Sequence, residues 1–426
     1  MNFIKRQPPG RLIAAGFALV ILAGAALLML PVSVRDGAQV TPIDALFTST
    51  SAVCVTGLIA IDTADHFTVF GRTIVALLIQ VGGLGVTSVG VGFILVAGKR
   101  VGFKSRLLVR EAMNMENGKG IVRLVKSILL MTLCFEGAGA LLSFLVFVQD
   151  HPPLEAIGIS IFHSIAAFNN SGFDILGGLQ NLIPYQNNLL LNLTTAGLII
   201  FGGLGFLVIL DILKKRSFRA LALHSKVVIV MILLGTLLLK ATENVTWLGA
   251  FFQSVSARTA GFSTYPIGSF TDAGLFVLIL LMFVGASPGS TGGGIKTTTL
   301  FALLQATRSA ATGRMPTAFR RTVAGEVVQK AFIVTLLSAF VVCGGTFILC
   351  LLEPDLTFLQ LLFEATSAFG TVGLSTGITP QLQPASKLIV ILIMYTGRIG
   401  PLTVASLWAF RTEQHVWYSE ETITIG

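Results

Sequence analysis

Four short stretches of this 426-residue chain carry the residues whose type and spacing suit the binding of an ion. In each, a phenylalanine is followed ten residues later by a glycine, with mostly small or hydroxyl-bearing residues between them. The pairs are Phe47/Gly57, Phe162/Gly172, Phe251/Gly261 and Phe363/Gly373. Glycine permits backbone angles that turn carbonyl oxygens toward one axis, and rings of such carbonyls can replace the hydration shell of a small cation. The four stretches therefore predict a cation site built mainly from backbone.

The residues at and just before each glycine form the candidate ion-binding set. They are Val55, Thr56 and Gly57; Asn170, Ser171 and Gly172; Thr259, Ala260 and Gly261; and Thr371, Val372 and Gly373. Ahead of the first set, the stretch that starts at Pro42 predicts a short helix with proline in its first turn. The negative end of that helix would face the loop and favour a cation there. Chance coincidence of Phe and Gly is the alternative, and four copies at one spacing argue against it.

The composition is that of an integral membrane protein. Of the 426 residues, 54% are hydrophobic and 12% are charged, whereas a soluble domain carries roughly twice that charged fraction. Eight apolar segments are long enough to cross a hydrocarbon core, which takes about 20 residues. They run near 12–34, 72–98, 122–148, 187–213, 225–242, 272–308, 326–352 and 387–410. The sixth is too long and too rich in glycine to form one continuous helix.

The four Phe/Gly loops fall between the members of successive pairs of segments. The predicted fold is all-α: helix, short pore helix, loop and helix, repeated four times. This gives eight transmembrane helices and four re-entrant loops in pseudo-fourfold symmetry around one pore, since non-helical backbone at membrane depth must lie inside protein or along a water-filled cavity. The repeats are expected to span residues 1–103, 104–220, 221–321 and 322–426.

Lysine and arginine gather on one side of these segments. The basic stretches lie at 5–11, 99–126, 214–226 and 308–330, whereas the opposite loops hold most of the acids. Because basic loops face the cytoplasm, both termini are expected inside, and the four loops enter from outside. The net charge of +9 is interpreted as this orientation signal, and nucleic acid is not an expected partner.

A second glycine pattern recurs in the second helix of each repeat. Gly82–Gly85 and Gly202–Gly205 have the same letters, the last repeat has Gly397–Gly400, and the third expands the place to 285–296. Close helix packing and a functional role are both open in the first two repeats. The third stretch cannot remain a regular helix and must line a cavity, so we expect an intramembrane gate loop there. The gate residues are Gly285, Ser287, Gly289, Ser290, Thr291, Gly292, Gly293, Gly294, Lys296 and Arg398.

Several charged residues fall within apolar segments or loops, where charge is costly and a functional role is the default. Arg398 is expected to face the pore or to tether the gate loop, with a salt-bridged packing role as the alternative. Lys296 either lines the pore or marks the cytoplasmic end of the gate loop. Arg258 and Glu364 flank two of the loops and are candidates to pair across the pore mouth, and Glu136 is expected to make a buried polar contact.

Catalytic and cofactor patterns are missing from the sequence. The five histidines are dispersed, which gives no metal-ligand cluster, and no catalytic Ser/His/Asp or Cys/His set is apparent. Between Gly294 and Lys296, Ile295 breaks the phosphate-binding loop pattern. We therefore expect neither an enzyme nor a nucleotide site on this chain.

Taken as a set, these motifs resemble the membrane subunit of the Trk/Ktr/HKT superfamily of potassium transporters, most closely the KtrB type. The resemblance is carried by the four loops, Ser287–Lys296 and Tyr395–Thr403, and covers about residues 10–426. The last loop is also close to the start of a potassium-channel filter. The resemblance implies that K⁺ is the transported ion, held at the backbone carbonyls of the four loops, and that the protein lies in the bacterial inner, or plasma, membrane.

The resemblance also implies partners. Such subunits form homodimers, with one pore in each protomer, on a cytosolic ring of KtrA-type RCK-domain subunits that bind nucleotides, and Na⁺ often activates uptake. Residues 99–126 and 214–226 are where that ring, or anionic membrane lipid, would bind. Each loop has a single glycine in place of the full Thr-Val-Gly-Tyr-Gly, which weakens the expected rejection of Na⁺. A TrkH-like or sodium-permeable transporter is the alternative, and an ion-coupled secondary carrier of another fold, which would need inverted repeats, is more remote.

Overall fold

A computed structural model describes residues 9–96, 102, 107–109, 121–204, 223–287, 290–313, 315, 317–318, 321–322 and 324–406 of the chain. Most of the basic stretch at 99–126, much of that at 214–226, the gate residue Gly289 and the tail from 407 onward lie outside the described residues.

The described helices follow one order four times. A first helix comes at α2 (Pro9–Leu28), α8 (Ile121–Phe147), α12 (Leu223–Thr242) and α16 (Gly325–Leu352). A shorter helix follows at α3 (Pro42–Cys54), α9 (Pro153–Phe168), α13 (Trp247–Ser256) and α17 (Phe358–Gly370). After a glycine-containing loop, a second helix comes at α5 (Val69–Leu84), α10 (Leu189–Leu204), α14 (Asp272–Phe283) and α18 (Pro384–Ile399).

The remaining described elements lie outside this fourfold order. The helices are α4 (Thr63–His66), α6 (Val86–Val96), α15 (Thr297–Thr312) and α19 (Pro401–Ser406). Single 3₁₀ turns occur at Pro31–Ser33, Ile183–Tyr185, Ile267–Ser269 and Thr379–Gln381. Strands β1 (Thr317–Ala318) and β2 (Arg321–Thr322) form a two-residue antiparallel pair. The part of the chain that is described is thus almost entirely α-helical.

Three of the four short helices begin at a threonine cap, whereas α9 begins after Pro152 without a side-chain cap. Thr41 accepts a hydrogen bond from the backbone N–H of Asp44, and Pro42 stands in the first turn of α3, as predicted. Thr357 and Gln360 form a reciprocal capping box at the start of α17. These local signals mark where α3 and α17 start.

Three described helices are long and apolar enough to cross a membrane: Gly10–Leu28, Ile121–Phe147 and Gly325–Leu352. Other predicted spans are interrupted. The second and eighth break at Gly85 and Gly400, whose φ values are +83° and +95°. The sixth stops being helical between Phe283 and Thr297, which confirms that it is not one continuous helix. The count of eight membrane crossings stays a prediction.

The first and short helices pack closely through small residues. In three of the four groups, a serine of the short helix donates its hydroxyl to a carbonyl of the preceding helix. A glycine one turn beyond that carbonyl leaves the room for the contact. The sets are Ser49, Ile21 and Gly24; Ser164, Glu136 and Gly139; and Ser254, Ile232 and Gly235.

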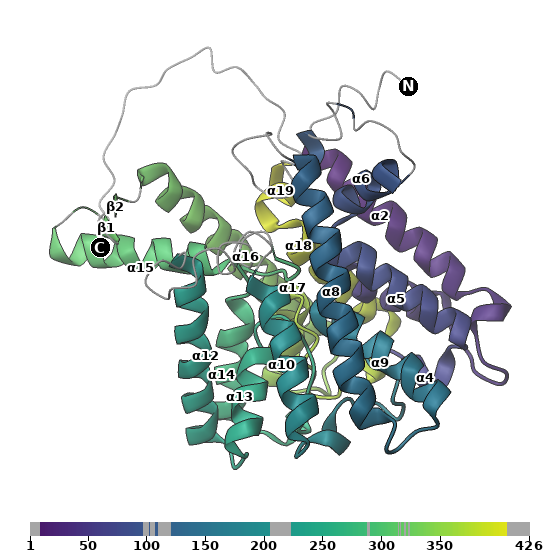
Figure 1. Cartoon of the computed structure of the whole chain (residues 1–426). Helices are drawn as coiled ribbons and strands as arrows, with labels where there is room; N and C mark the ends of the chain where they lie inside the picture. Colours follow the sequence, from purple (N-terminus) through teal and green to yellow (C-terminus); the bar gives the residue numbers. More distant parts are fainter. Residues whose placement is uncertain are drawn as a thin grey trace.

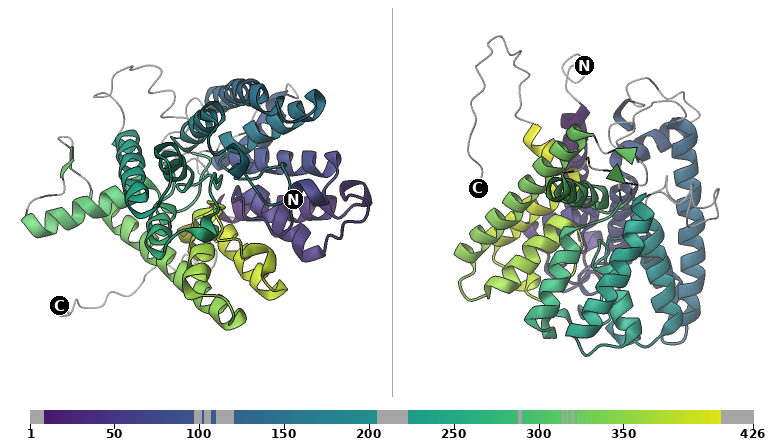
Figure 2. Two further views of the ribbon diagram at one scale, coloured as in Figure 1. Left: turned by 90° about the horizontal axis from the view of Figure 1, so that it is seen from below. Right: turned by 90° about the vertical axis from the view of Figure 1, so that its left-hand side faces the viewer.

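The four groups of helices surround a central set of loops. Figure 1 shows them in sequence order from purple to yellow, and the left view of Figure 2 shows them arranged about the centre. Each second helix packs against the short helix of the following group, as α5 does on α9, α10 on α13 and α14 on α17. Finally α18 packs against α3, so the last group lies beside the first and the arrangement is closed.

Candidate ion-binding site

The four glycine loops touch one another in a closed cycle. A methyl group built on Gly57 would overlap the carbonyl oxygen of Ser171, and one on Gly172 would lie 2.7 Å from that of Ala260. The other two glycines continue the cycle. A methyl group on Gly261 would overlap the carbonyl oxygen of Val372, and one on Gly373 would overlap that of Thr56. All four glycines have positive φ, which side chains rarely adopt. Only glycine fits these positions, and every candidate set of residues meets the next.

Three of the loops leave their short helix through the same unusual conformation. Val55, Asn170 and Thr371, each two residues before the loop glycine, have φ values of +57°, +59° and +49°. This region is unfavourable for β-branched residues such as valine and threonine, and such strain is concentrated at functional sites. The third loop differs, because Ala260 and Gly261 both donate backbone N–H groups to the carbonyl of Ser256.

Serine hydroxyls that the sequence analysis did not single out hold two of the glycines. The hydroxyl of Ser51 accepts from the N–H of Gly57 at 3.0 Å and donates to the carbonyl of Leu58 at 2.8 Å. Ser367 accepts from the N–H of Gly373 at 3.0 Å. Both serines stand six residues before their glycine, and this shared spacing was the signal that would have found them.

The glycines of the second helices lie against the ends of the short helices. Methyl groups on Gly82, Gly202 and Gly397 would overlap the carbonyl oxygens of Val53, Phe168 and Phe369, each four residues before a loop glycine. Close packing, one of the two readings of the glycine motifs, therefore accounts for these positions.

On one side of the cycle lies a cavity of about 320 Å³, which we call the mouth cavity. Its lining includes Gly57, Gly261 and Gly373, together with residues that follow the loop glycines. Asn181 spans two loops there, donating to the carbonyl of Gly172 at 3.2 Å and accepting from the N–H of Ser263 at 3.0 Å. The repeated motif does not predict a role for Asn181, because this residue lies outside it.

Glu364 forms hydrogen bonds with the part of the fourth loop that lines the mouth cavity. Its buried carboxylate accepts from the hydroxyl of Ser375, from the hydroxyl of Thr379 at 2.9 Å and from the N–H of Thr376 at 3.2 Å. Arg258 instead donates to the carbonyl of Gly285 at 3.0 Å. The expected pairing of Arg258 with Glu364 is therefore wrong, since each side chain is engaged by backbone or hydroxyl groups of a different segment.

Three acids, Asp62, Asp65 and Asp174, follow the first and second loop glycines in the chain. Asp62 and Asp65 accept from the N–H groups of Leu179 at 2.7 Å and Gly178 at 3.1 Å, which ties the first loop region to the second. Burial raises the pKa of Asp174 to about 7, with Asp62 and Asp65 adding to the rise, against the opposing effect of the Leu176 N–H.

On the other side of the cycle lies the stretch between α14 and α15. Its base is closed by a hydrogen bond of 2.9 Å from the N–H of Gly285 to the carbonyl of Ile295. The stretch reaches the ion-binding set, because the N–H of Gly293 donates to the hydroxyl of Thr371 at 2.9 Å. Ser290 bonds back to the carbonyl of Ser287 at 2.6 Å.

The same stretch is tied to neighbouring helices. The N–H groups of Ser287 and Thr291 donate to the carbonyls of Gly203 and Gly202, at 3.2 and 3.4 Å. Arg398 donates to the carbonyls of Thr291 and Gly82, so its guanidinium tethers this stretch to α5.

The Lys296 ammonium bonds to the carbonyl of Gly292 at 2.7 Å and so folds back onto the stretch. Of the predicted gate residues that are described, all lie in or against this segment, with Gly294 at its turn of positive φ, +66°.

Glu136 makes the buried polar contact expected of it. Its carboxylate accepts from Asn169 at 3.0 Å and from Gln80 at 3.3 Å, and Asn169 also donates to Gln80 at 2.9 Å. These side chains come from α8, α5 and the end of α9, so the network joins two groups of helices behind the second loop.

Long apolar helices around a closed cycle of glycine loops define a membrane transport protein. The chain belongs to the TrkH family of cation transport proteins, whose model matches residues 13–243 and 221–418. The family consists of transporters, so the protein is not an enzyme.

Similar proteins place it within that family. It is 39% identical to Ktr system potassium uptake protein B of Bacillus subtilis (strain 168), over 100% of this chain and 98% of that protein. It is 38% identical to potassium/sodium uptake protein NtpJ of Enterococcus hirae, over 99% of this chain and 98% of that protein. It is 37% identical to Ktr system potassium uptake protein B of Vibrio alginolyticus, over 98% of this chain and 94% of that protein. The chain is thus of the KtrB type.

The fold has a solved counterpart. The crystal structure of the potassium transporter TrkH from Vibrio parahaemolyticus matches with a TM-score of 0.73 and 20% sequence identity, covering 95% of this chain and 86% of that one. At this identity the likeness supports the fold.

Proposed function

We propose that the protein takes up K⁺ across the plasma membrane by channel-like conduction through the four loops. The observation that carries the proposal is the closed cycle of contacts among Gly57, Gly172, Gly261 and Gly373. The names of relatives that are 36 to 39% identical, which include Ktr system potassium uptake proteins, support K⁺ as the ion.

The chemistry of conduction falls to the backbone. In this proposal, the carbonyl oxygens of the candidate filter residues replace the water around a dehydrated K⁺. The helices α3, α9, α13 and α17 each end shortly before their loop glycine, so their dipoles would favour a cation there. The four repeats with boundaries at 103, 220 and 321, each contributing one loop, are part of this proposal.

The stretch at 285–296 is proposed as the gate. Its support is its position against Thr371 and its attachment through Arg398 to α5. A segment held by a few hydrogen bonds can be released at modest free-energy cost, about 1 kcal/mol for each net hydrogen bond.

Sodium enters the proposal in two ways. One relative is named a potassium/sodium uptake protein, and a loop with a single glycine offers fewer ordered carbonyl sites than a full potassium-channel filter. We propose Na⁺ as an activator, and a sodium-permeable pathway is the alternative that an ion-replacement assay separates.

The proposed assembly is a homodimer with its termini in the cytoplasm, on a ring of KtrA-type RCK-domain subunits that carry the nucleotide. The name "Ktr system" of the relatives supports a multi-component system. The basic stretches at 99–126 and 214–226 are the proposed contacts with that ring or with anionic lipid.

The test is uptake of ⁸⁶Rb⁺ into proteoliposomes that contain this chain alone. Gly373→Ser should abolish uptake or admit Na⁺, because a side chain there overlaps the carbonyl of Thr56. Gly137→Ser is the matched control, since a methyl group on Gly137 meets nothing within 4 Å.

Deletion of residues 287–294 should increase uptake if the stretch is a gate. If the Gly373→Ser and Gly137→Ser proteins transport equally, the four-loop filter is wrong. If the deletion leaves uptake unchanged, the gate is wrong.

A further inference from the structure

One hydrogen bond joins the proposed gate directly to the proposed filter. The backbone N–H of Gly293 donates to Oγ1 of Thr371 at 2.9 Å, and Thr371 is fully buried. Thr371 also has the strained φ of +49°, a conformation that costs about 1–3 kcal/mol and persists only where the surroundings hold it. The contact therefore joins the gate to a residue whose geometry is already constrained.

The rest of the interface leaves no room between the loop and the filter. A methyl group on Gly292 would lie 2.7 Å from both Oγ1 and Cγ2 of Thr259, and one on Gly293 would lie 2.8 Å from Cγ2 of Thr371. Two adjacent glycines thus let the gate stretch seat directly on two threonines of the ion-binding set.

The bond with Gly293 occupies an acceptor site of the Thr371 hydroxyl. A threonine hydroxyl has one proton and two acceptor lone pairs, and a buried acceptor that loses its partner is costly unless another partner replaces it. If the stretch moved away, this acceptor site would be open to the permeating cation or its water.

We propose that the Thr371 hydroxyl serves two partners in turn: the N–H of Gly293 while the gate is closed, and the permeating cation once it is open. This rests on the proposed function. Thr371 then latches the gate and also determines ion preference, so that the inner end of the filter is complete only when the gate has moved.

Substitutions separate the two roles. Thr371→Val removes the hydroxyl and keeps the shape, and the equivalent Val55 already adopts a φ of +57°, so valine is compatible with this backbone. Thr371→Ser keeps the hydroxyl. Gly293→Ala keeps the hydroxyl but drives the stretch away from Thr371 by overlap.

The control is Thr346→Val, the same substitution at a hydroxyl that, within the described part of the chain, donates to the carbonyl of Val342 on its own helix, at 2.8 Å. All variants are purified, checked by size-exclusion chromatography in detergent and reconstituted without any partner subunit. Initial rates of ⁸⁶Rb⁺ and ²²Na⁺ uptake are then measured.

Thr371→Val should raise the ⁸⁶Rb⁺ rate about fivefold, as expected for the loss of one net hydrogen bond from the closed state, and should lower the Rb⁺/Na⁺ ratio severalfold. Gly293→Ala should raise the ⁸⁶Rb⁺ uptake rate and leave the Rb⁺/Na⁺ ratio unchanged. Thr371→Ser and Thr346→Val should resemble the wild type.

The proposal is overturned if the wild-type protein transports ⁸⁶Rb⁺ and the Thr371→Val and Thr371→Ser variants have the same uptake rate and the same Rb⁺/Na⁺ ratio. It is also overturned if Thr371→Val raises the uptake rate without changing the Rb⁺/Na⁺ ratio. Absence of ⁸⁶Rb⁺ uptake by the wild type and by the 287–294 deletion overturns the proposed function, and this inference with it.

Discussion

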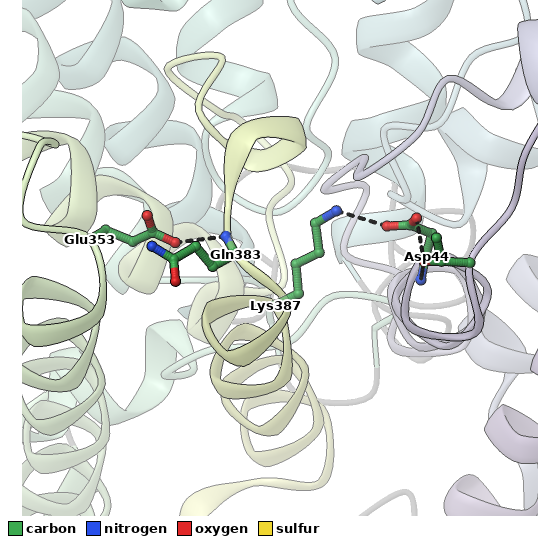
Figure 3. Close-up of polar contacts among 5 residues, drawn as sticks. Asp44, Glu353, Gln383 and Lys387 are labelled. Carbon is green, nitrogen blue, oxygen red and sulfur yellow. Dashed lines mark hydrogen bonds and ion pairs between the residues drawn. The ribbon is translucent and has the colours of Figure 1, made fainter.

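Lys387 and Asp44 join the last group of helices to the first. The ammonium of Lys387, on α18, lies 2.7 Å from Oδ1 of Asp44, in the first turn of α3, and each side chain is 10% exposed. Figure 3 shows the lysine reaching across from one helix to the other, with the nearby bond from the N–H of Gln383 to Glu353. The pair closes a cycle of helices whose ends are more than 340 residues apart.

Removing one member of this pair should destabilise the protein. A nearly buried ion pair that loses a partner leaves an uncompensated charge, which costs about 3–5 kcal/mol, whereas an apolar replacement of both is often neutral. Lys387→Met and Asp44→Leu should each lower the melting temperature in detergent by several degrees, and the double variant should recover most of the loss. Lys330→Met, at an exposed lysine, is the control. Additive losses in the double variant would contradict the pairing.

Glu364 should be a positioning residue for the fourth loop. Glu364→Ala leaves the N–H of Thr376 and the hydroxyls of Ser375 and Thr379 without this acceptor. The loss costs about 1–3 kcal/mol at the buried Thr379 hydroxyl, and less at the half-buried Ser375 and Thr376. We expect ⁸⁶Rb⁺ uptake to fall at least about tenfold and discrimination against Na⁺ to weaken. Glu364→Gln, which retains one acceptor, should keep more of both. Equal uptake by the alanine variant and the wild type would exclude the positioning role.

Asn181 should influence ion preference through a single carbonyl. Its amide N–H donates to the carbonyl of Gly172, while its oxygen accepts from the N–H groups of Leu182 and Ser263. Asn181→Asp keeps the acceptor and loses the donor, so the carbonyl of Gly172 becomes free to turn. The Rb⁺/Na⁺ uptake ratio should change while protein yield and melting temperature do not. An unchanged ratio with intact expression would show that this carbonyl does not bind the ion.

Much of the candidate site could be predicted because its signals are local. Glycine marks the positive-φ positions, as at Gly57 and Gly373, and the composition of 285–296 excludes a regular helix. Helix ends were less predictable. The apolar pattern continues through Gly85 and Gly400, where the helices in fact break, and the first helix ends at Leu28, ahead of Pro31, although the apolar run extends to 34.

Contacts between distant segments could not be predicted in the same way. Arg258 and Glu364 both flank loop glycines, but the sequence does not reveal that Arg258 reaches the carbonyl of Gly285 while Glu364 reaches Ser375. Those partners depend on how four groups of helices pack together. For the same reason, neither Asn181 nor the partners of Glu136 followed from the repeated motif.

Asp174 should make stability depend on pH. Burial raises its pKa from 3.8 to about 7 in the folded protein, so the folded state binds an extra proton between these values. The free energy of unfolding therefore falls as the pH rises through this range. Asp174→Asn removes the titrating group and can still accept from the N–H of Leu176. Its melting temperature in detergent should exceed that of the wild type at pH 8.5, and by less at pH 5. Asp355→Asn, at an exposed acid, is the control. If Asp174→Asn raised the melting temperature equally at both pH values, the shifted pKa would be contradicted.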